Sequence, residues 1–393
     1  MNIPEHFKSI ARTSKRPTTK DPFLPAVRQS VSPKNHLSSP LSRSPAPGHR
    51  SKRSISNTPY TLPDLKNSKS GSRTSGTARM ETGKASDRPC GVVKAYAVNS
   101  YSGRHHNEDR LSIIINIQCP SDIEENIWPS SSFYGLYDGH SGKACSEYLK
   151  KHLAELILKN KHFPRNTKKA IFSGFIQADK EFLSVAKENG EMSGSCATVV
   201  MIIGDKCFVA NTGDSRAFIC LNQGKNITTI STEHKPGDTN EYNRIINAGG
   251  KVYNNYMIND KGENYNFGPH LLAPGKLKVS RAFGDLDAKD EEYGGNPKVL
   301  IPDPHIKSFP IRPDQDFMFI ATASVFEKFT NREISDIVFG NITSKKGAGI
   351  DLQMLSAIDE IFNEAINRVC DENMSVILIA LKGLKLYSEE NAK

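Results

Sequence analysis

The sequence predicts an α+β domain in which helices pack outside an antiparallel sheet core. Short apolar runs rich in β-branched and aromatic residues recur from about residue 197 onward, which is typical of buried strands. Two longer segments instead carry apolar residues at spacings of three and four, which is typical of helices with one buried face. Because strands and helices form separate groups along the chain, they favour antiparallel sheets over strictly alternating parallel units.

The expected helices differ in length and in how they end. The first covers 143–160 and the last covers 351–369, each with a continuous apolar stripe. Between them, a short helix runs from Glu241 to Ala248 and stops at Gly249-Gly250, because glycine readily adopts the backbone conformation that ends a helix. The expected strands are, in order, 197–203, 208–210, 217–221, 317–322 and 376–381.

Composition excludes several classes of protein. The chain has 393 residues, of which 37% are hydrophobic, and a formal net charge of +9. No run approaches the ~20 apolar residues that a membrane span needs, and the first residues lack the apolar stretch of a secretory signal. The seven cysteines include no CxxC pair, so we expect reduced, buried thiols rather than disulfides or a zinc site.

The positive charge is concentrated in residues 1–88. This segment holds 17 Lys and Arg against 5 Asp and Glu, and 10 of the 22 prolines. Such a composition buries too little apolar surface to offset chain entropy. We therefore expect an extended arm over 1–88 that is disordered when alone, a folded domain over 89–387 and a short C-terminal tail over 388–393.

The arm suggests electrostatic docking on a polyanion, although a plain solvated or regulatory tail is the alternative. The scarcity of aromatic residues argues against nucleic acid as the partner, and the absence of an amphipathic stripe argues against membrane binding. An acidic protein surface such as a microtubule fits better. This predicts a cytoplasmic protein. Association with the cytoskeleton, a cilium or an axoneme is compatible with this prediction, and a nuclear location is not excluded by the sequence. Phosphorylation at four proline-directed sites would weaken docking; they are Ser32, Ser39, Ser44 and Thr58.

Acidic residues and glycines cluster where the expected strands end. Carboxylates that converge on one sheet edge repel one another unless a cation lies between them, and their hard oxygens suit Mg²⁺ or Mn²⁺. Glycine lets backbone carbonyls approach such a ligand. The clusters occur, in order, at 104–110 (RHHNEDR), 136–142 (LYDGHSG), 211–216 (NTGDSR), 279–285 (VSRAFGD) and 371–375 (DENMS).

This order of motifs resembles the PP2C (PPM) family of metal-dependent Ser/Thr protein phosphatases. The resemblance covers about residues 91–383 and includes Glu233-His-Lys-Pro236 and the long signature from Lys278 to Asp285. It implies a β-sandwich of two antiparallel sheets with helices on both outer faces, and a two-metal centre at one end of that sandwich.

The family's metal ligands transfer to particular residues of this chain. Asp138 would bridge two Mn²⁺ or Mg²⁺ ions, and Glu108 with the Gly139 carbonyl would complete one site. Glu372 would be a weak ligand of the second ion, and Asp214 matches a weaker third site. A water between the metals would attack the phosphorus of a phosphoprotein substrate.

Two further residues match the family's catalytic side chains. Arg104 would hold the substrate phosphate, because a guanidinium group pairs with phosphate through two parallel hydrogen bonds. His140 would protonate the leaving alkoxide.

The chain departs from the family at its second metal site. Ala323-Ser324 stands where the family carries Asp-Gly, and Glu372 stands in place of an aspartate. We therefore expect a pseudophosphatase or a severely weakened phosphatase that serves as a binding or scaffold module. The alternative is an active phosphatase in which Glu327, Glu372 or Asp371 rearranges to restore the site. The inserted segment 254–274 is expected to form a flap beside it.

Overall fold

The computed structural model describes residues 78–79, 92–103, 106–119, 128–258 and 264–392. All of these belong to one compact unit that spans Ser68–Lys393. Almost all of the basic arm, including its four candidate phosphorylation sites, lies outside the described residues. Arg104 also lies outside them.

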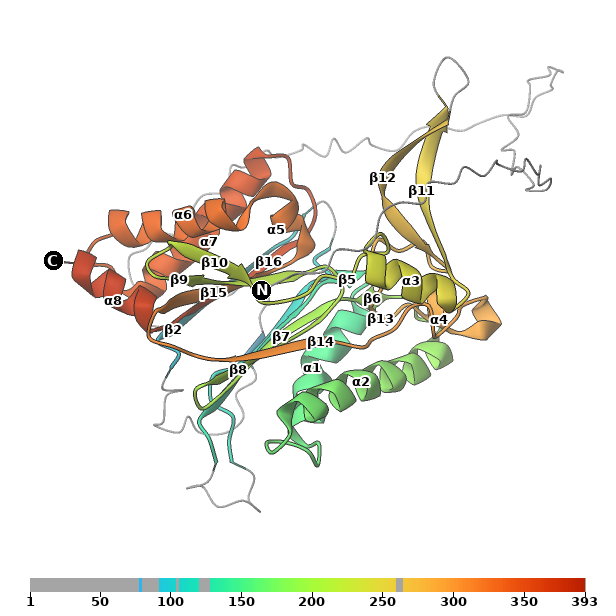
Figure 1. The fold of residues 1–393 in the computed structure, drawn as a ribbon, viewed down its shortest axis with the longest axis horizontal. Coiled ribbons are helices and arrows are strands. Elements are labelled where there is room, and N and C mark those ends of the chain that lie inside the picture. Colours follow the sequence, from blue (N-terminus) through green and yellow to red (C-terminus); the bar gives the residue numbers. More distant parts are fainter. Residues whose placement is uncertain (1–77, 80–91, 104–105, 120–127, 259–263, 393) are drawn as a thin grey trace, which may run out of the picture. The chain divides into compact units, whose positions relative to one another are not determined.

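Two sheets form the centre of the domain (Figure 1). The first has the order β1-β3-β4-β7-β8-β14, and the second has the order β10-β9-β15-β16-β2. Every neighbouring pair in them is antiparallel except β1 and β3. The first sheet consists of β1 (Ala78–Arg79), β3 (Arg110–Ile114), β4 (Ser131–Tyr137), β7 (Ala197–Ile203), β8 (Lys206–Thr212) and β14 (His305–Pro310). The second consists of β2 (Ala95–Tyr101), β9 (Arg216–Leu221), β10 (Asn226–Thr229), β15 (Gln315–Ala321) and β16 (Met374–Ala380).

Three apolar clusters divide the domain into four layers. The middle cluster joins side chains of both sheets, such as Leu136 and Val200 from the first and Met318 and Ile377 from the second. A second cluster packs the outer face of the first sheet against α1 (Ala144–Leu158) and α2 (Thr167–Asn189).

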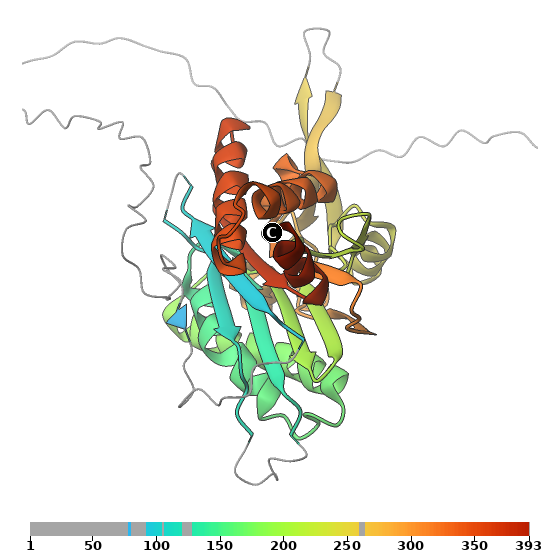
Figure 2. The ribbon, with the colours of Figure 1, turned by 90° about the vertical axis from the view of Figure 1, so that its left-hand side faces the viewer.

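The third cluster packs the outer face of the second sheet against three helices (Figure 2). These helices are α6 (Asn331–Ser344), α7 (Ile350–Asn367) and α8 (Lys382–Asn391). The predicted fold class, two antiparallel sheets flanked by helices on both outer faces, is therefore confirmed.

Short elements complete the end of the sandwich where the acidic motifs lie. One small sheet joins β5 (Gly139–His140), β6 (Gly194–Ser195) and β13 (Phe283–Gly284), in the order β13-β6-β5. A hairpin of β11 (Lys251–Ile258) and β12 (Asn264–Ala273) projects beside α3 (Thr239–Asn247). The remaining elements are α4 (Leu286–Lys289), η2 (Glu291–Tyr293) and α5 (Ala323–Lys328).

The predicted helices at 143–160, 241–248 and 351–369 correspond to α1, α3 and α7. At the C-terminus, α8 continues to Asn391. Within the described part of the chain, none of the helices combines the length and the apolar character needed to cross a membrane.

Candidate functional site

One open pocket of about 670 Å³ collects most of the candidate residues. Strand ends and loops far apart in the sequence meet there, as we predicted from the acidic motifs. The candidate residues that line it are Glu108, Asp138, Gly139, His140, Asp214, Ala323, Ser324 and Glu372. Their individual roles stay predictions, and Arg104 is not among the described residues.

The Asp138-Gly139 pair shows why this turn needs glycine. A β-carbon at position 139 would lie 2.4 Å from the backbone oxygen of Glu108, far inside van der Waals contact. The Ser146 hydroxyl donates to the same oxygen at 2.5 Å. Glu108 and Asp138 are thereby held on neighbouring backbone segments, at the start of β3 and the end of β4.

Carboxylates crowd the pocket: Asp109 is buried, and Asp138 and Asp214 are partly buried. Burial and repulsion from Asp214 raise the pKa of Asp138 to about 7, although His140 and hydrogen bonds oppose the shift. The Asp138 carboxylate accepts hydrogen bonds from the Ser215 hydroxyl at 3.3 Å and from the backbone N–H of Ala323. Burial and the Asp138 charge also hold the pKa of Asp109 well above its usual range. Such a group favours a bound proton or a bound cation.

His140 forms a close pair with Asp285. Its Nε2 lies 2.8 Å from Asp285 Oδ1, and Asp285 is almost completely buried. Burial lowers the pKa of His140, but the Asp285 carboxylate outweighs this and the net pKa is raised. The pair meets only because residue 194 is glycine: a β-carbon there would lie 2.3 Å from Asp285 Oδ2 and 2.4 Å from His140 Nε2. This geometry favours the protonated form of His140 beside the pocket.

Hydroxyl groups occupy the place where β15 ends and β16 begins. The Ser324 hydroxyl donates to the backbone oxygen of Asn373 at 2.6 Å and lies 3.1 Å from the Thr322 hydroxyl. The Thr322 hydroxyl in turn accepts the backbone N–H of Ser375 at 3.1 Å. Position 323 contributes a backbone N–H to this region, not a carboxylate.

Glu372 does not join the buried carboxylates in this arrangement. Its side chain is about half exposed and lies 3.8 Å from the Lys278 ammonium group. Within the described ranges, no three His, Cys, Asp or Glu side chains are grouped so that they could hold a metal ion. At position 323, where the family resemblance places a ligand of the second metal, the pocket lining has Ala323 and no carboxylate. Glu108, Asp138 and the Gly139 carbonyl remain compatible with one Mg²⁺, because that ion uses one or two carboxylates and keeps several waters.

The inserted segment forms the expected flap. It corresponds to most of the β11–β12 hairpin, and Pro269 and His270 from β12 line a second pocket of about 510 Å³. That pocket shares Asp214 and Ala323 with the first one. The hairpin therefore borders the site on the side of α5.

A buried ionic network supports the same end of the domain. Glu241 in α3 accepts hydrogen bonds from the Ser280 hydroxyl at 2.8 Å and from the guanidinium groups of Arg244 and Arg281 at 2.5–3.2 Å. Burial raises the pKa of Glu241, but the two arginines outweigh it and lower the pKa to about 2. The network ties α3 to the segment that leads to Asp285.

Sequence reasoning missed two carboxylates of the site. Asp285 and Asp109 both lie in motifs that were recognised, but no role was given to either. The signal for Asp285 is weak in the sequence, since its partner His140 is 145 residues away. For Asp109, its position directly after Glu108 at the start of a buried strand was a usable signal.

The chain is similar to known protein phosphatases over most of its folded domain. Residues 97–374 match the family described as Protein phosphatase 2C. The chain is 30% identical to Protein phosphatase 1A of Homo sapiens over 311 residues, which cover 76% of this chain and 73% of that protein. It is 28% identical to Probable protein phosphatase 2C 57 of Oryza sativa subsp. japonica over 289 residues, which cover 73% and 72% of the two chains.

Solved structures show the same fold. A sex determining protein of C. elegans superimposes with a TM-score of 0.62 at 21% identity, covering 76% of this chain and 67% of the other. A serine-threonine phosphatase 2C from Toxoplasma gondii gives 0.57 at 19% identity, covering 74% and 97%. The family generally depends on Mg²⁺ or Mn²⁺. This chain belongs to the protein phosphatase 2C family.

Proposed function

We propose that this PP2C-family protein has weak or no phosphatase activity and acts as a binding or scaffold module. The observation that carries the proposal is Ala323. It lines the pocket where the family resemblance calls for a metal-binding aspartate, and it offers only a backbone N–H to Asp138. Removing a residue that only hydrogen-bonds to a metal ligand typically weakens metal binding ~10–100-fold. Loss of a direct carboxylate ligand is expected to weaken it further.

The second candidate function is an active Mg²⁺- or Mn²⁺-dependent Ser/Thr phosphatase that acts on a phosphoprotein. Two metals would supply an activated water nucleophile. The observation in favour is the His140–Asp285 pair, in which the carboxylate raises the pKa of a histidine next to the pocket. Asp371 and Glu372 also line the pocket, so a rotation of Glu372 away from Lys278 would bring a carboxylate closer.

An activity assay with matched variants separates the two functions. Hydrolysis of a phosphothreonine peptide with Mn²⁺ is measured for the wild type, for Ala323→Asp, and for the triple variant Ala323→Asp, Ser324→Gly, Glu372→Asp. We expect a silent wild type and measurable activity in the triple variant. Ser324→Gly alone is the control, because it removes two hydrogen bonds without adding a ligand.

Metal binding gives a readout that does not depend on turnover. Electron paramagnetic resonance of added Mn²⁺ counts bound ions directly, and we expect at most one weakly bound ion in the wild type. A wild type that hydrolyses the peptide as fast as the triple variant, with two bound ions, would overturn the proposal in favour of the second candidate.

We also propose that the basic arm, residues 1–88, docks the domain on an acidic protein surface such as a microtubule. The support is its charge, 17 basic against 5 acidic residues. The full chain should co-sediment with polymerised tubulin at low salt and be released at about 0.5 M salt, where screening is strong. Replacing Lys15, Arg16, Lys52 and Arg53 by alanine should weaken co-sedimentation.

Phosphate mimicry tests the regulation of the arm. Replacing Ser32, Ser39, Ser44 and Thr58 by glutamate should weaken co-sedimentation further. In cells, the tagged wild-type chain should co-localise with the cytoskeleton, including a cilium or axoneme. Failure of the full chain to co-sediment at low salt, or accumulation of the tagged chain in the nucleus alone, would contradict this part of the proposal.

A further inference from the structure

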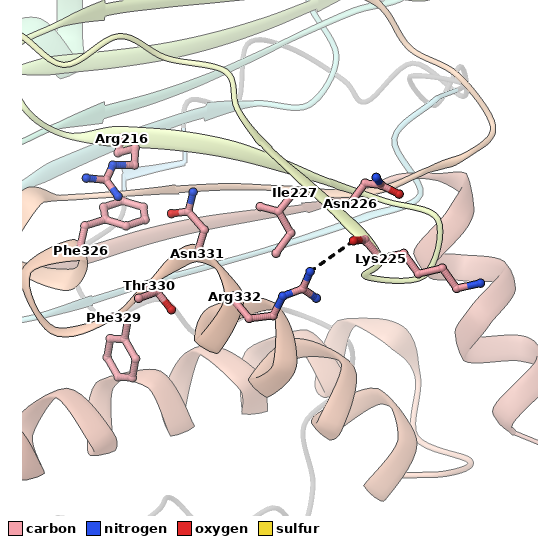
Figure 3. A pocket seen from close by; sticks show the side chains of 9 residues that line it. All are labelled: Arg216, Lys225, Asn226, Ile227, Phe326, Phe329, Thr330, Asn331 and Arg332. Atoms are coloured by element: carbon pink, nitrogen blue, oxygen red, sulfur yellow. Dashed lines mark hydrogen bonds between the residues drawn. The ribbon is translucent and has the colours of Figure 1, made fainter.

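We propose that an open groove between β10 and the first turn of α6 is a docking site for an extended acidic peptide segment of a partner protein. The groove has a volume of about 720 Å³ and is shown in Figure 3. We call it the basic groove and define it by Arg216, Lys225, Ile227, Phe326, Asn331 and Arg332. It lies outside the carboxylate pocket, and the proposal does not depend on whether the chain hydrolyses phosphoesters.

The groove carries positive charge on both walls. Among the described residues that line it, Arg216, Lys225 and Arg332 are cationic and none is acidic. Arg332 donates to the backbone oxygens of Gly224 at 2.5 Å and Lys225 at 3.3 Å, which positions its guanidinium group across the groove (Figure 3). The lining therefore complements an acidic ligand.

Nearby carboxylates cancel this charge only in part. Asp336 lies 3.9 Å from Arg332, but both side chains are more than half exposed, so the pair is weak. Glu233 pairs with Arg216 at 2.7 Å, but it is shared with Lys235 at the same distance. Positive charge therefore remains available at Arg332 and Lys225.

The groove also offers apolar contact. The Arg216 guanidinium lies over the Phe326 ring, 4.6 Å from its centre. Phe326 and Ile227 are both partly buried and face the groove (Figure 3). An extended segment that alternates acidic and apolar side chains would satisfy both features at once. The N-terminus of α6 plays no part in this argument, because Thr330 and Glu333 already cap it.

The groove continues toward the candidate site. Arg216 and Phe326 also line the second pocket, which in turn shares Lys278, Ala323 and other walls with the carboxylate pocket. The second pocket carries carboxylates at Asp214, Glu233, Asp238 and Glu327, so the acidic segment is confined to the basic groove. The chain's own arm is a poor occupant, since 17 of its ionisable side chains are basic and only 5 are acidic.

Fluorescence anisotropy with the full chain tests the proposal. The probe is a short fluorescein-labelled peptide of alternating Glu and Val, and peptides of alternating Gln and Val or Lys and Val are its neutral and basic counterparts. Arg332→Glu and Lys225→Glu should each weaken binding of the acidic probe about tenfold, because each replaces a positive charge that lines the groove by a negative one. Lys346→Glu makes the same charge change in an exposed turn beyond the other end of α6 and is the matched control.

Photo-crosslinking separates the groove from the basic arm. A benzophenone version of the acidic probe should label the chain around residues 225–227 and 326–332, and thermal melting checks that the variants remain folded. Labelling confined to residues 1–88, equal weakening by Lys346→Glu, or equal binding of the neutral peptide would each overturn the proposal. Lys225→Glu keeps the test valid if Arg332→Glu unfolds the turn that Arg332 supports.

Discussion

Asp138→Asn should stabilise the metal-free protein at alkaline pH, although it removes a residue of the candidate site. Burial and the Asp214 charge raise the pKa of Asp138 from 3.8 to about 7. The folded state therefore holds the Asp138 proton more tightly than the unfolded state does. The stability that this proton contributes is complete below about pH 4 and is lost as the pH rises to about 7. Asparagine keeps the acceptor for Ser215 and Ala323 but carries no charge.

The size of the effect follows from the shift. A difference of about 3 pKa units would correspond to about 4 kcal/mol at pH 8. Because Asp138 is only partly buried at the edge of an open pocket, water screens part of this penalty, and we expect about 2 kcal/mol. At pH 4 the variant and the wild type should differ by less than about 0.5 kcal/mol.

Urea unfolding in EDTA at pH 4 and pH 8 measures this difference. Asp205→Asn, at an exposed aspartate, is the control and should change stability by less than about 0.5 kcal/mol at either pH. A variant that is less stable than the wild type at pH 8, or that differs from it equally at both pH values, would refute the argument that burial and the Asp214 charge destabilise the Asp138 carboxylate.

Three further predictions concern the framework around the site. Glu241→Gln should cost about 3 kcal/mol at pH 7, because a pKa of about 2 lies roughly 2.5 units below the ordinary value; in urea unfolding, the wild-type advantage should be present above about pH 4.5 and vanish as the pH falls to about 2. Lys289→Met should cost about 3–5 kcal/mol by leaving the buried Asp179 carboxylate without its ion-pair partner, whereas adding Asp179→Leu should recover most of that loss in the same assay. Gly194→Ala should push His140 from its carboxylate partner, so an NMR titration should show its pKa falling from the wild-type value; an unchanged pKa would mean that the pair is not what raises it.

The sequence predicted the fold best where periodicity was strong. The stripe in α7 and the apolar strands of the second sheet were expected close to their observed positions. No helix was predicted at α2, although Ala170, Ile171 and Phe175 of its buried face follow the same spacing. That stripe is harder to read because lysines and other polar residues interrupt it.

Some contacts of the candidate site could likewise be predicted from the sequence, and others could not. Carboxylates that follow or precede strands could be expected to converge, because in an antiparallel sheet the end of one strand lies beside the start of its neighbour. The His140–Asp285 pair could not be predicted from the sequence, since it depends on the small β13-β6-β5 sheet and on the absence of a side chain at Gly194. The ion pair of Glu372 with Lys278 depends on side-chain rotation, which no sequence pattern specifies.

The contrast between Asp138 and Ala323 indicates which chemistry the pocket can still support. Asp138 carries a desolvation penalty that only a proton or a cation relieves, and Glu108 with the Gly139 carbonyl lies beside it. One weakly held divalent cation would offset that penalty. A second cation would need a carboxylate near residue 323, where the chain supplies a backbone N–H that already bonds to Asp138.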